Sequence, residues 1–303
     1  MKIITMLVVS AGVYVYNMHV DGSRSEATDV ATQEQTSVSS EAGVRTKGGD
    51  SSGKGNNSTT HQSRDAQPRT SGIEIPAYLT DRPEEIIQHV GHTISYNSKW
   101  GVPNWVAWEL TPERTSGGER RADNFQPDER IRKGPVVTTY DYRGSGYDRG
   151  HMCPAADNKH DRRAMNECFL MTNICPQVHA LNAGDWEELE NKCRTWARKY
   201  GAIYIVAGPV IRKGETYERI GENGVMVPKQ FYKVVMRLNA DETADAIGFV
   251  YNNNDEQHPM SYYARSVDEV EALTGINFFS KLAKDVERKA EAVCDVSRWS
   301  CLR

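Results

Sequence analysis

The 303-residue chain lacks features on which several classes of protein depend. It has 37 Lys and Arg against 41 Asp and Glu, so it has no excess positive charge with which to coat nucleic acid. None of its six cysteines forms a C-x-x-C pair, which argues against a structural zinc site. Residues 21–72 contain no aromatic residue, cysteine, leucine or isoleucine. Because such a segment cannot bury enough apolar surface to offset its ordering entropy, we expect a disordered linker rich in Ser, Thr and Gly.

The first 20 residues are typical of a secretory signal, in which a short basic start precedes about 7–15 apolar residues. Lys2 precedes an apolar run over residues 3–15, which weakens towards residue 20. The run is interrupted and shorter than the roughly 20 residues that a spanning helix needs. We therefore predict an exported protein (periplasmic, cell-surface or extracellular) with a cleaved signal peptide or an uncleaved signal anchor at 1–20. The anchor would be its only contact with a membrane, and a buried N-terminal helix is the alternative.

The composition changes near residue 73, which predicts one folded domain over residues 73–303. All six tryptophans and all six cysteines lie beyond this point. The first 72 residues contain seven basic and seven acidic residues, so the net charge of −4 belongs to the domain. An even number of cysteines in an exported chain predicts disulfides. We expect Cys294 to pair with Cys301, and a second hypothesis links Cys153 to Cys175 or Cys168.

Periodic apolar segments predict an α+β fold with a mixed, mainly antiparallel β-sheet core and flanking helices. Strands are expected at residues 104–110, 135–142, 202–210, 230–238 and 246–251. Helices are expected at residues 185–200, 267–273 and 278–293. A glycine-bearing loop at 143–147 follows the second strand.

The densest group of reactive side chains follows this loop. His151 has a pKa range suited to taking a proton from water near neutrality, and Arg149 can hold an anionic oxygen through two donors. Downstream, Asn182, Trp186 and Glu190 are spaced by four residues, so on a helix they would share one face over two turns, and Gly184 could weaken the early part of that helix. One neutral amide oxygen suits Mg²⁺, which keeps most of its waters, and a nearby carboxylate can orient those waters. A base, an arginine and a hydrated hard cation together describe phosphodiester hydrolysis.

Each of these residues also has an ordinary structural explanation. A single loop histidine is usually structural or simply exposed, and Asp–Arg pairs are usually surface ion pairs. An asparagine at the start of a helix is usually a cap. These explanations account for each position but do not explain why the residues occur together.

The combined motifs resemble those of the DNA/RNA non-specific endonucleases, the sugar-non-specific ββα-metal nucleases that include the Serratia nuclease and mitochondrial endonuclease G. Residues 147–157, YDRGHMCPAAD, are similar to the family's D-R-G-H signature. A second block supplies the family's Gln, Asn and Glu at Gln177, Asn182 and Glu190. The resemblance extends to residues 104–108, 121–125, 208–209 and 227–228, and therefore covers nearly all of residues 85–285.

The resemblance implies a ββα-metal active-site motif and a role for each matching residue. His151 would be the general base that activates water, and Asn182 the direct ligand of Mg²⁺, for which Mn²⁺ can substitute. Glu190 would hold the water molecules of the metal. The phosphate would be bound by Arg149 and Arg121, with Arg120 as the alternative to the second arginine. Gln177 would also contact the substrate.

These roles imply a metal-dependent endonuclease that cleaves DNA and RNA and leaves 5′-phosphate ends. Two other functions stay open at this point. A catalytically inactive nucleic-acid-binding module would keep the fold, although it would not need the base, the arginine and the metal ligand together. A phosphodiesterase that acts on small substrates would use the same chemistry and would differ in the shape of its cleft.

Overall fold

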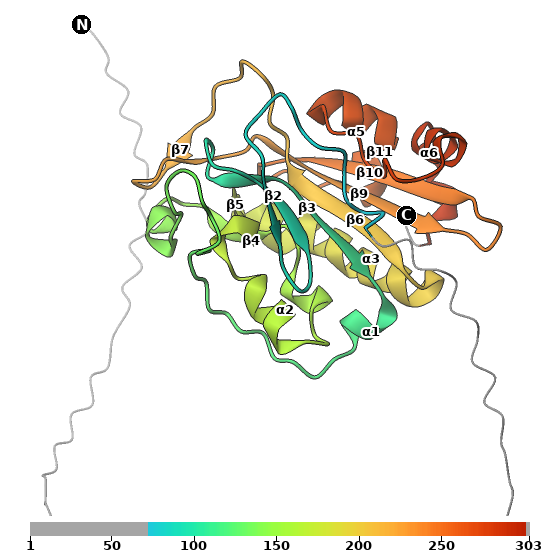
Figure 1. The fold of residues 1–303 in the computed structure, drawn as a ribbon, viewed down its shortest axis with the longest axis horizontal. Coiled ribbons are helices and arrows are strands. Elements are labelled where there is room, and N and C mark those ends of the chain that lie inside the picture. Colours follow the sequence, from blue (N-terminus) through green and yellow to red (C-terminus); the bar gives the residue numbers. More distant parts are fainter. Residues whose placement is uncertain (1–71, 301–303) are drawn as a thin grey trace, which may run out of the picture. The chain divides into compact units, whose positions relative to one another are not determined.

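The computed structural model describes residues 72–300 and has a seven-stranded antiparallel sheet at its centre (Figure 1). Its strands run in the order β1-β2-β3-β6-β9-β10-β11. Their bounds are β1 Glu85–Gln88, β2 Thr93–Asn97, β3 Val102–Leu110, β6 Ile203–Pro209, β9 Gln230–Leu238, β10 Ala244–Asn252 and β11 Ala264–Arg265. The predicted α+β class and the predicted strands at 104–110, 202–210, 230–238 and 246–251 are confirmed.

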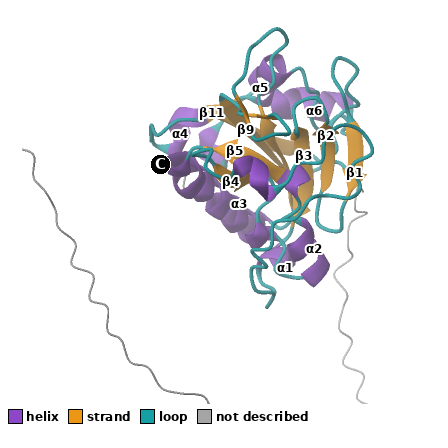
Figure 2. Ribbon diagram, turned by 90° about the vertical axis from the view of Figure 1, so that its left-hand side faces the viewer, coloured by secondary structure: helices purple, strands orange, loops and turns teal. Residues whose placement is uncertain are grey.

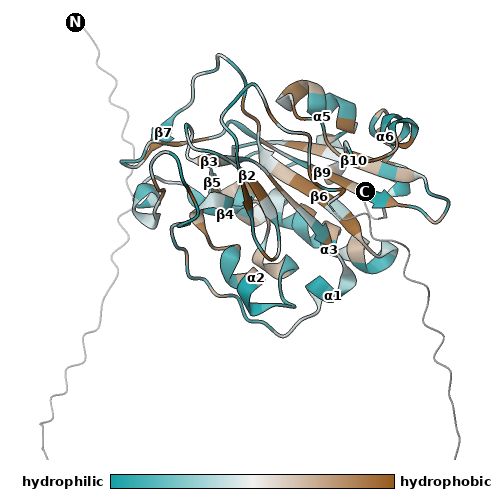
Figure 3. Cartoon of the chain, in the orientation of Figure 1, coloured by the Kyte–Doolittle hydropathy of each residue, from teal (hydrophilic) through white to brown (hydrophobic). Residues whose placement is uncertain are grey.

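Both faces of the central strands are buried, because successive side chains of β3, β6, β9 and β10 enter two different apolar clusters. On β3, Val106 and Trp108 belong to the cluster that packs against α3 (Trp186–Tyr200). Trp105 and Ala107 belong to the cluster that includes residues of α5 (Val267–Thr274) and α6 (Lys284–Glu291). Figure 2 shows α3 on one side of the strands and α5 and α6 on the other. Apolar residues accordingly gather on the central strands (Figure 3).

A second, two-stranded sheet lies beside α3 and presents the D-R-G-H residues. It pairs β4 (Asp148–His151) with β5 (Ile174–Gln177) in an antiparallel register that sets His151 opposite Ile174. A π-helical turn at Leu181–Asp185 joins directly to α3, and Gly184 in this turn has non-helical backbone angles. Two strands followed by a helix therefore form a ββα unit. The predicted helix at 185–200 and the weakening of its start by Gly184 are both confirmed.

Short elements complete the described part of the chain. The helices are α1 Pro112–Thr115, η1 Thr139–Tyr142, η2 Ala155–Asp157, α2 Arg162–Glu167, η3 Met171–Asn173, α4 Met260–Tyr263 and η5 Val296–Arg298. The π-helical turn is η4, and a small hairpin is formed by β7 Arg219–Ile220 and β8 Val225–Met226.

Two of the predicted elements are wrong. Residues 135–142 form no strand, because Thr138 caps the turn η1 and its own backbone N–H is bonded to the Asp141 carboxylate. The predicted helix at 278–293 begins only at Lys284. Phe279, with a φ of 42°, interrupts the helical path before that residue.

The cysteines at 153, 168, 175, 193 and 294 are free thiols, so the predicted staple between Cys153 and Cys175 or Cys168 is not formed. Burial raises the pKa of the Cys153 and Cys175 thiols well above the usual value, which keeps them protonated and unreactive. Cys301, the predicted signal at 1–20 and nearly all of the predicted linker lie outside the described residues. Within residues 72–300, no helix has the length and hydrophobicity needed to cross a membrane.

Candidate functional site

His151, at the end of β4, lies in a pocket walled by aromatic rings. Its imidazole centroid is 5.3 Å from that of Phe125 and 4.9 Å from that of Phe169. The side chain is buried, and its Nε2 atom has no hydrogen-bond partner among the described residues. Burial, reinforced by the positive charges of Arg121 and Arg149, lowers the pKa of His151 to about 3. The imidazole is therefore neutral at physiological pH.

Two exposed guanidinium groups lie on the rings that enclose His151. The Cζ atom of Arg149 is 4.2 Å from the Phe125 centroid, and that of Arg121 is 5.2 Å from the Phe169 centroid. Stacking of this kind contributes about 0.5–1 kcal/mol at exposed sites and orients the side chain. Among the described residues, Arg121 forms an ion pair with the exposed carboxylate of Asp123, 3.6 Å away. Both cations thus keep donors available for an anion beside the imidazole.

Asn182 lies in the π-helical turn and is held by β4. Its Nδ2 donates to Oδ2 of Asp148 over 2.9 Å, and the same oxygen is 2.7 Å from Nδ1 of His179. Because the amide nitrogen is engaged, Oδ1 is the atom of this side chain that can meet a cation. Asp148 therefore acts as an orienting group for Asn182.

Glu190 lies two helical turns further on. Burial raises its pKa to about 7, an effect opposed by the nearby charges of Lys233 and Arg194. Lys233, in β9, is 1% exposed, and its Nζ lies 4.2 Å from the Trp186 ring centroid with no hydrogen-bond partner in the described part of the chain. Arg194 is fixed by a 2.9 Å hydrogen bond to the buried Asp157. Two cations therefore face Glu190 from within the protein.

Gln177 lies in a different position from the one expected for a substrate contact. It is fully enclosed, and neither atom of its amide group has a hydrogen-bond partner among the described residues. The side chain packs on Gly150, where an added Cβ would lie 1.9 Å from Oε1 of Gln177. In this structure Gln177 supports the back of β4, and it requires glycine at that point.

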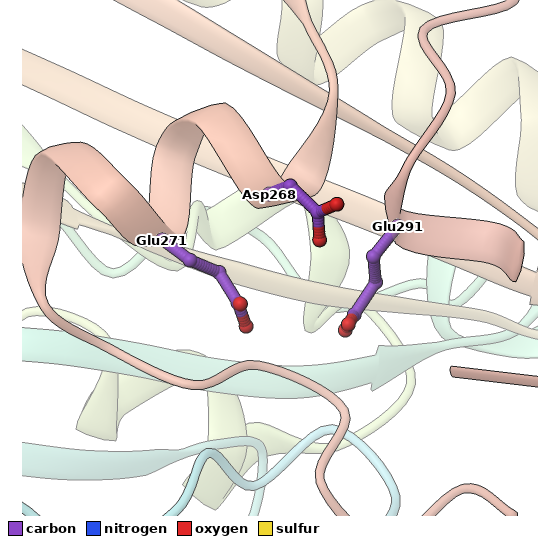
Figure 4. A group of neighbouring side chains, drawn as sticks. All are labelled: Asp268, Glu271 and Glu291. Atoms are coloured by element: carbon purple, nitrogen blue, oxygen red, sulfur yellow. The ribbon is translucent and has the colours of Figure 1, made fainter. Parts of the chain in front are cut away.

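The donor set suits a hydrated hard cation and does not suit a tightly enclosed transition metal. The amide oxygen of Asn182 and the carboxylate of Glu190 are oxygen donors, and burial raises the pKa of Glu190 in spite of the opposing charges of Lys233 and Arg194. Among the described residues, the one group of three His, Cys, Asp or Glu ligand atoms within 4.8 Å of one another lies elsewhere. It consists of Asp268, Glu271 and Glu291, on α5 and α6 (Figure 4). The oxygen atoms of Asn182 and Glu190 are therefore the candidates for holding a cation that keeps most of its waters.

The structure places Arg149 and Arg121 on the aromatic wall of His151, and Asn182 against Asp148 of the same strand. Gln177 is enclosed behind Gly150 of that strand, and Glu190 lies on α3 near the charges of Lys233 and Arg194. Arg120 is exposed, whereas Arg121 contacts the aromatic wall of His151. The sequence reasoning missed Phe125 and Phe169 as walls of the site. It also missed Lys233, although a lysine inside the apolar run of 230–238 was a visible signal.

A histidine and an arginine on β4 and an asparagine in the turn that leads into α3, within a unit of two strands and a helix beside an antiparallel sheet, define a ββα-metal nuclease fold. The chain belongs to the DNA/RNA non-specific endonuclease family, whose model matches residues 69–285. It is 36% identical over 225 residues to the mitochondrial nuclease EXOG of Xenopus laevis, covering 70% of this chain and 62% of that protein. The chain therefore spans less than two thirds of the length of this relative.

Two other relatives match with similar coverage. A nuclease of a Nostoc species is 35% identical over 215 residues (67% of this chain and 76% of that protein). Human mitochondrial endonuclease G is 31% identical over 216 residues (68% and 73%). A crystal structure of the EndoG/EndoGI complex superposes with a TM-score of 0.62 at 30% identity, covering 67% of this chain and 89% of that one.

The comparison contradicts the expected location outside the cell. EXOG of Xenopus laevis, human endonuclease G and nuclease 1 of Schizosaccharomyces pombe are all named as mitochondrial proteins. The prediction of export is therefore wrong. It rested on the apolar run over residues 3–15, and such a run indicates affinity for a membrane without specifying which membrane.

Proposed function

We propose that the chain is a metal-dependent endonuclease that hydrolyses phosphodiester bonds of DNA and RNA and leaves 5′-phosphate ends, with residues 73–303 as its catalytic domain. The observation that carries the proposal is a neutral imidazole whose aromatic wall carries two exposed guanidinium groups, with the Asn182 amide held against Asp148 of the same strand. Membership of the endonuclease family supports the same reaction.

His151 is the proposed general base. Because Nε2 is enclosed, Nδ1 is the nitrogen that takes the proton from the water molecule attacking phosphorus. The backbone oxygen of His151 accepts a 3.1 Å hydrogen bond from Nε1 of Trp186, which fixes the end of β4 against α3. The base therefore stays in place while water and substrate exchange.

Arg149 and Arg121 are proposed to bind the scissile phosphate on either side of His151. Each guanidinium offers several donors in a fixed fork, which suits phosphate oxygens better than a lysine would. Their stacking on Phe125 and Phe169 restricts the side chains before substrate arrives. The contact with Phe169 supports Arg121 over Arg120 in this role.

Asn182 would hold the cation through Oδ1, and Glu190 would hold it through water. When bound, Mg²⁺ (or Mn²⁺ in its place) would stabilise negative charge on the leaving 3′ oxygen. Asp148 keeps the Asn182 amide in the required orientation. The proposed groups all address phosphate and metal, and none addresses a base edge or the 2′-hydroxyl, which supports cleavage of both DNA and RNA with little sequence preference.

The test is digestion of plasmid DNA, single-stranded DNA and RNA by the full chain, with and without EDTA. We expect cleavage of all three, loss of cleavage in EDTA and recovery with Mg²⁺. His151→Ala should lower turnover by about 10²–10⁴-fold, as expected for loss of a general base, while His160→Ala, at an exposed histidine, should leave it unchanged. Cleavage by His151→Ala near the normal rate would refute the assigned base. Activity that is indifferent to EDTA would refute the metal role.

The names of the relatives also support a mitochondrial location as a proposal. A fluorescent fusion to the carboxyl end of the full chain should coincide with a mitochondrial marker. Signal confined to the medium or to the secretory pathway would contradict this proposal.

A further inference from the structure

A hollow of about 470 Å³ lies directly beside the proposed catalytic residues. Its volume is within the range of sites that bind small organic molecules, about 300–1,000 Å³. Asp148 and Arg149 form one side of it. The other side is formed by residues of η1 and the loop after it, namely Thr139, Tyr140, Tyr142 and Arg143, together with Tyr147.

Tyr140 is the feature of this hollow that core packing does not explain. Its side chain is 75% exposed, although a large aromatic residue is ordinarily packed against other side chains. The Cζ atom of Arg143 lies 5.7 Å from the centroid of the Tyr140 ring. A guanidinium over one face of the ring leaves the opposite face open to solvent.

The turn that carries Tyr140 is rigid. Asp141 is buried and accepts hydrogen bonds from the backbone N–H groups of Thr138, over 2.8 Å, and Asn223, over 3.0 Å. The amide group of Asn223 also donates to this carboxylate over 2.9 Å. An exposed ring on a fixed backbone loses little conformational entropy when a ligand binds.

The same turn is tied to the catalytic strands. Tyr142 is buried and its hydroxyl group lies 3.5 Å from the backbone oxygen of Ile174, the residue paired with His151. Arg149 lines the hollow and also stacks on the aromatic wall of His151. A ligand on Tyr140 would therefore share Arg149 with a phosphate held at the aromatic wall of His151.

We propose that this hollow is a binding subsite for one base of single-stranded nucleic acid, stacked on Tyr140, with Arg143 and Arg149 holding neighbouring phosphates. This inference rests on the proposed nuclease function and extends it to a substrate class. Stacking on an aromatic ring needs a free base face, which an unpaired nucleotide offers and an internal base pair does not. The two positive charges of Arg143 and Arg149 outnumber the one negative charge in the lining of the hollow, that of Asp148.

The test measures binding apart from cleavage. Fluorescence anisotropy of a labelled 12-nucleotide single strand with the full chain, in EDTA, gives Kd without turnover. We expect Tyr140→Ala and Tyr140→Leu to raise Kd by about tenfold, within the range measured for loss of one stacked base. Tyr140→Phe should bind within about twofold of the unaltered chain. Tyr78→Ala is the matched control, since Tyr78 is 72% exposed and adjoins Leu79, which packs on the other face of the sheet.

A blunt-ended duplex should show less than about a threefold change with the same variants. The subsite is refuted if Tyr140→Ala binds the single strand as the unaltered chain does, if Tyr78→Ala weakens it equally, or if the duplex loses as much affinity. With Mg²⁺ present, Tyr140→Ala should raise KM for the single strand and leave kcat unchanged. If the unaltered chain cleaves nucleic acid while Tyr140→Ala is normal, only the subsite fails. If it neither cleaves nor binds nucleic acid, the proposed function fails with it.

Discussion

The proton affinity of His151 should set the lower pH limit of the proposed reaction. Burial and the charges of Arg121 and Arg149 lower its pKa from an ordinary 6.5 to about 3. Both causes penalise the protonated form, and the difference corresponds to about 5 kcal/mol in favour of the neutral imidazole. The imidazole should therefore be unprotonated, as a general base must be, at any pH above about 4.

The perturbation is a change of pH from 7 to 5, and the quantity to follow is kcat/KM, which reports the groups of the free enzyme. A histidine with an ordinary pKa would lose about 25-fold of its neutral form over this interval. With a pKa of about 3, His151 would lose less than about 5%. Glu190, with a pKa of about 7, titrates in the same interval and must be separated from it.

Magnesium concentration separates the two groups. A cation competes with the proton for Glu190, so an acid limb due to Glu190 should move to lower pH as Mg²⁺ is raised. A limb due to His151 should not move. The assay is the initial rate of cleavage of a fluorescent oligonucleotide from pH 5 to 8 at two Mg²⁺ concentrations. A limb near pH 6.5 that is indifferent to Mg²⁺ would refute the assignment of a strongly lowered pKa to the base.

Three further substitutions test the surroundings of the site and the sheet. Gly150→Ala places a Cβ 1.9 Å from Oε1 of the enclosed Gln177, so we expect a loss of about 1–3 kcal/mol in thermal unfolding and reduced turnover; full activity at an unchanged Tm would contradict the packing argument. Asp157→Ala leaves Arg194 without its partner and should cost about 3 kcal/mol in urea unfolding, whereas a loss below about 0.5 kcal/mol would show that the ion pair is dispensable. Burial raises the pKa of Glu291 to about 8, so ionisation of this side chain lowers the stability of the folded protein between about pH 5 and 8. Glu291→Gln should therefore raise the free energy of unfolding by about 1–2 kcal/mol at pH 8 and leave it unchanged at pH 5. An equal increase at both pH values would exclude a charge effect.

Local patterns predicted most of the sheet, because its strands are continuous apolar runs bounded by turns. Residues 230–238 form β9 with the predicted bounds. The order of the strands was beyond local patterns, since β3 pairs with β6 almost a hundred residues later. The segment 135–142 misled the prediction because the hydrogen bonds of Thr138 and Asp141 outweigh the β propensity of its valines and tyrosines.

The residues of the site likewise fall into those that sequence motifs reveal and those that only the folded structure reveals. His151, Asn182 and Glu190 could be singled out from the sequence, since each lies in a short motif, on β4, in the π-helical turn and on α3 respectively. Phe125 and Phe169 lie on loops outside the motif strands and meet His151 only in the folded chain. The enclosure of Gln177 likewise depends on packing against Gly150, which sequence spacing does not reveal.

Trp186 joins the reaction centre to the core in a way that bears on how the protein loses activity. Its indole donates to the backbone of His151 and packs 5.7 Å from the ring of Phe231 in the central sheet. Strand β4 cannot detach while this side chain stays buried. Amide hydrogens of β4 should therefore exchange with solvent only through global unfolding. In rising denaturant, inactivation should coincide with the loss of tryptophan burial, with no folded but inactive species in between.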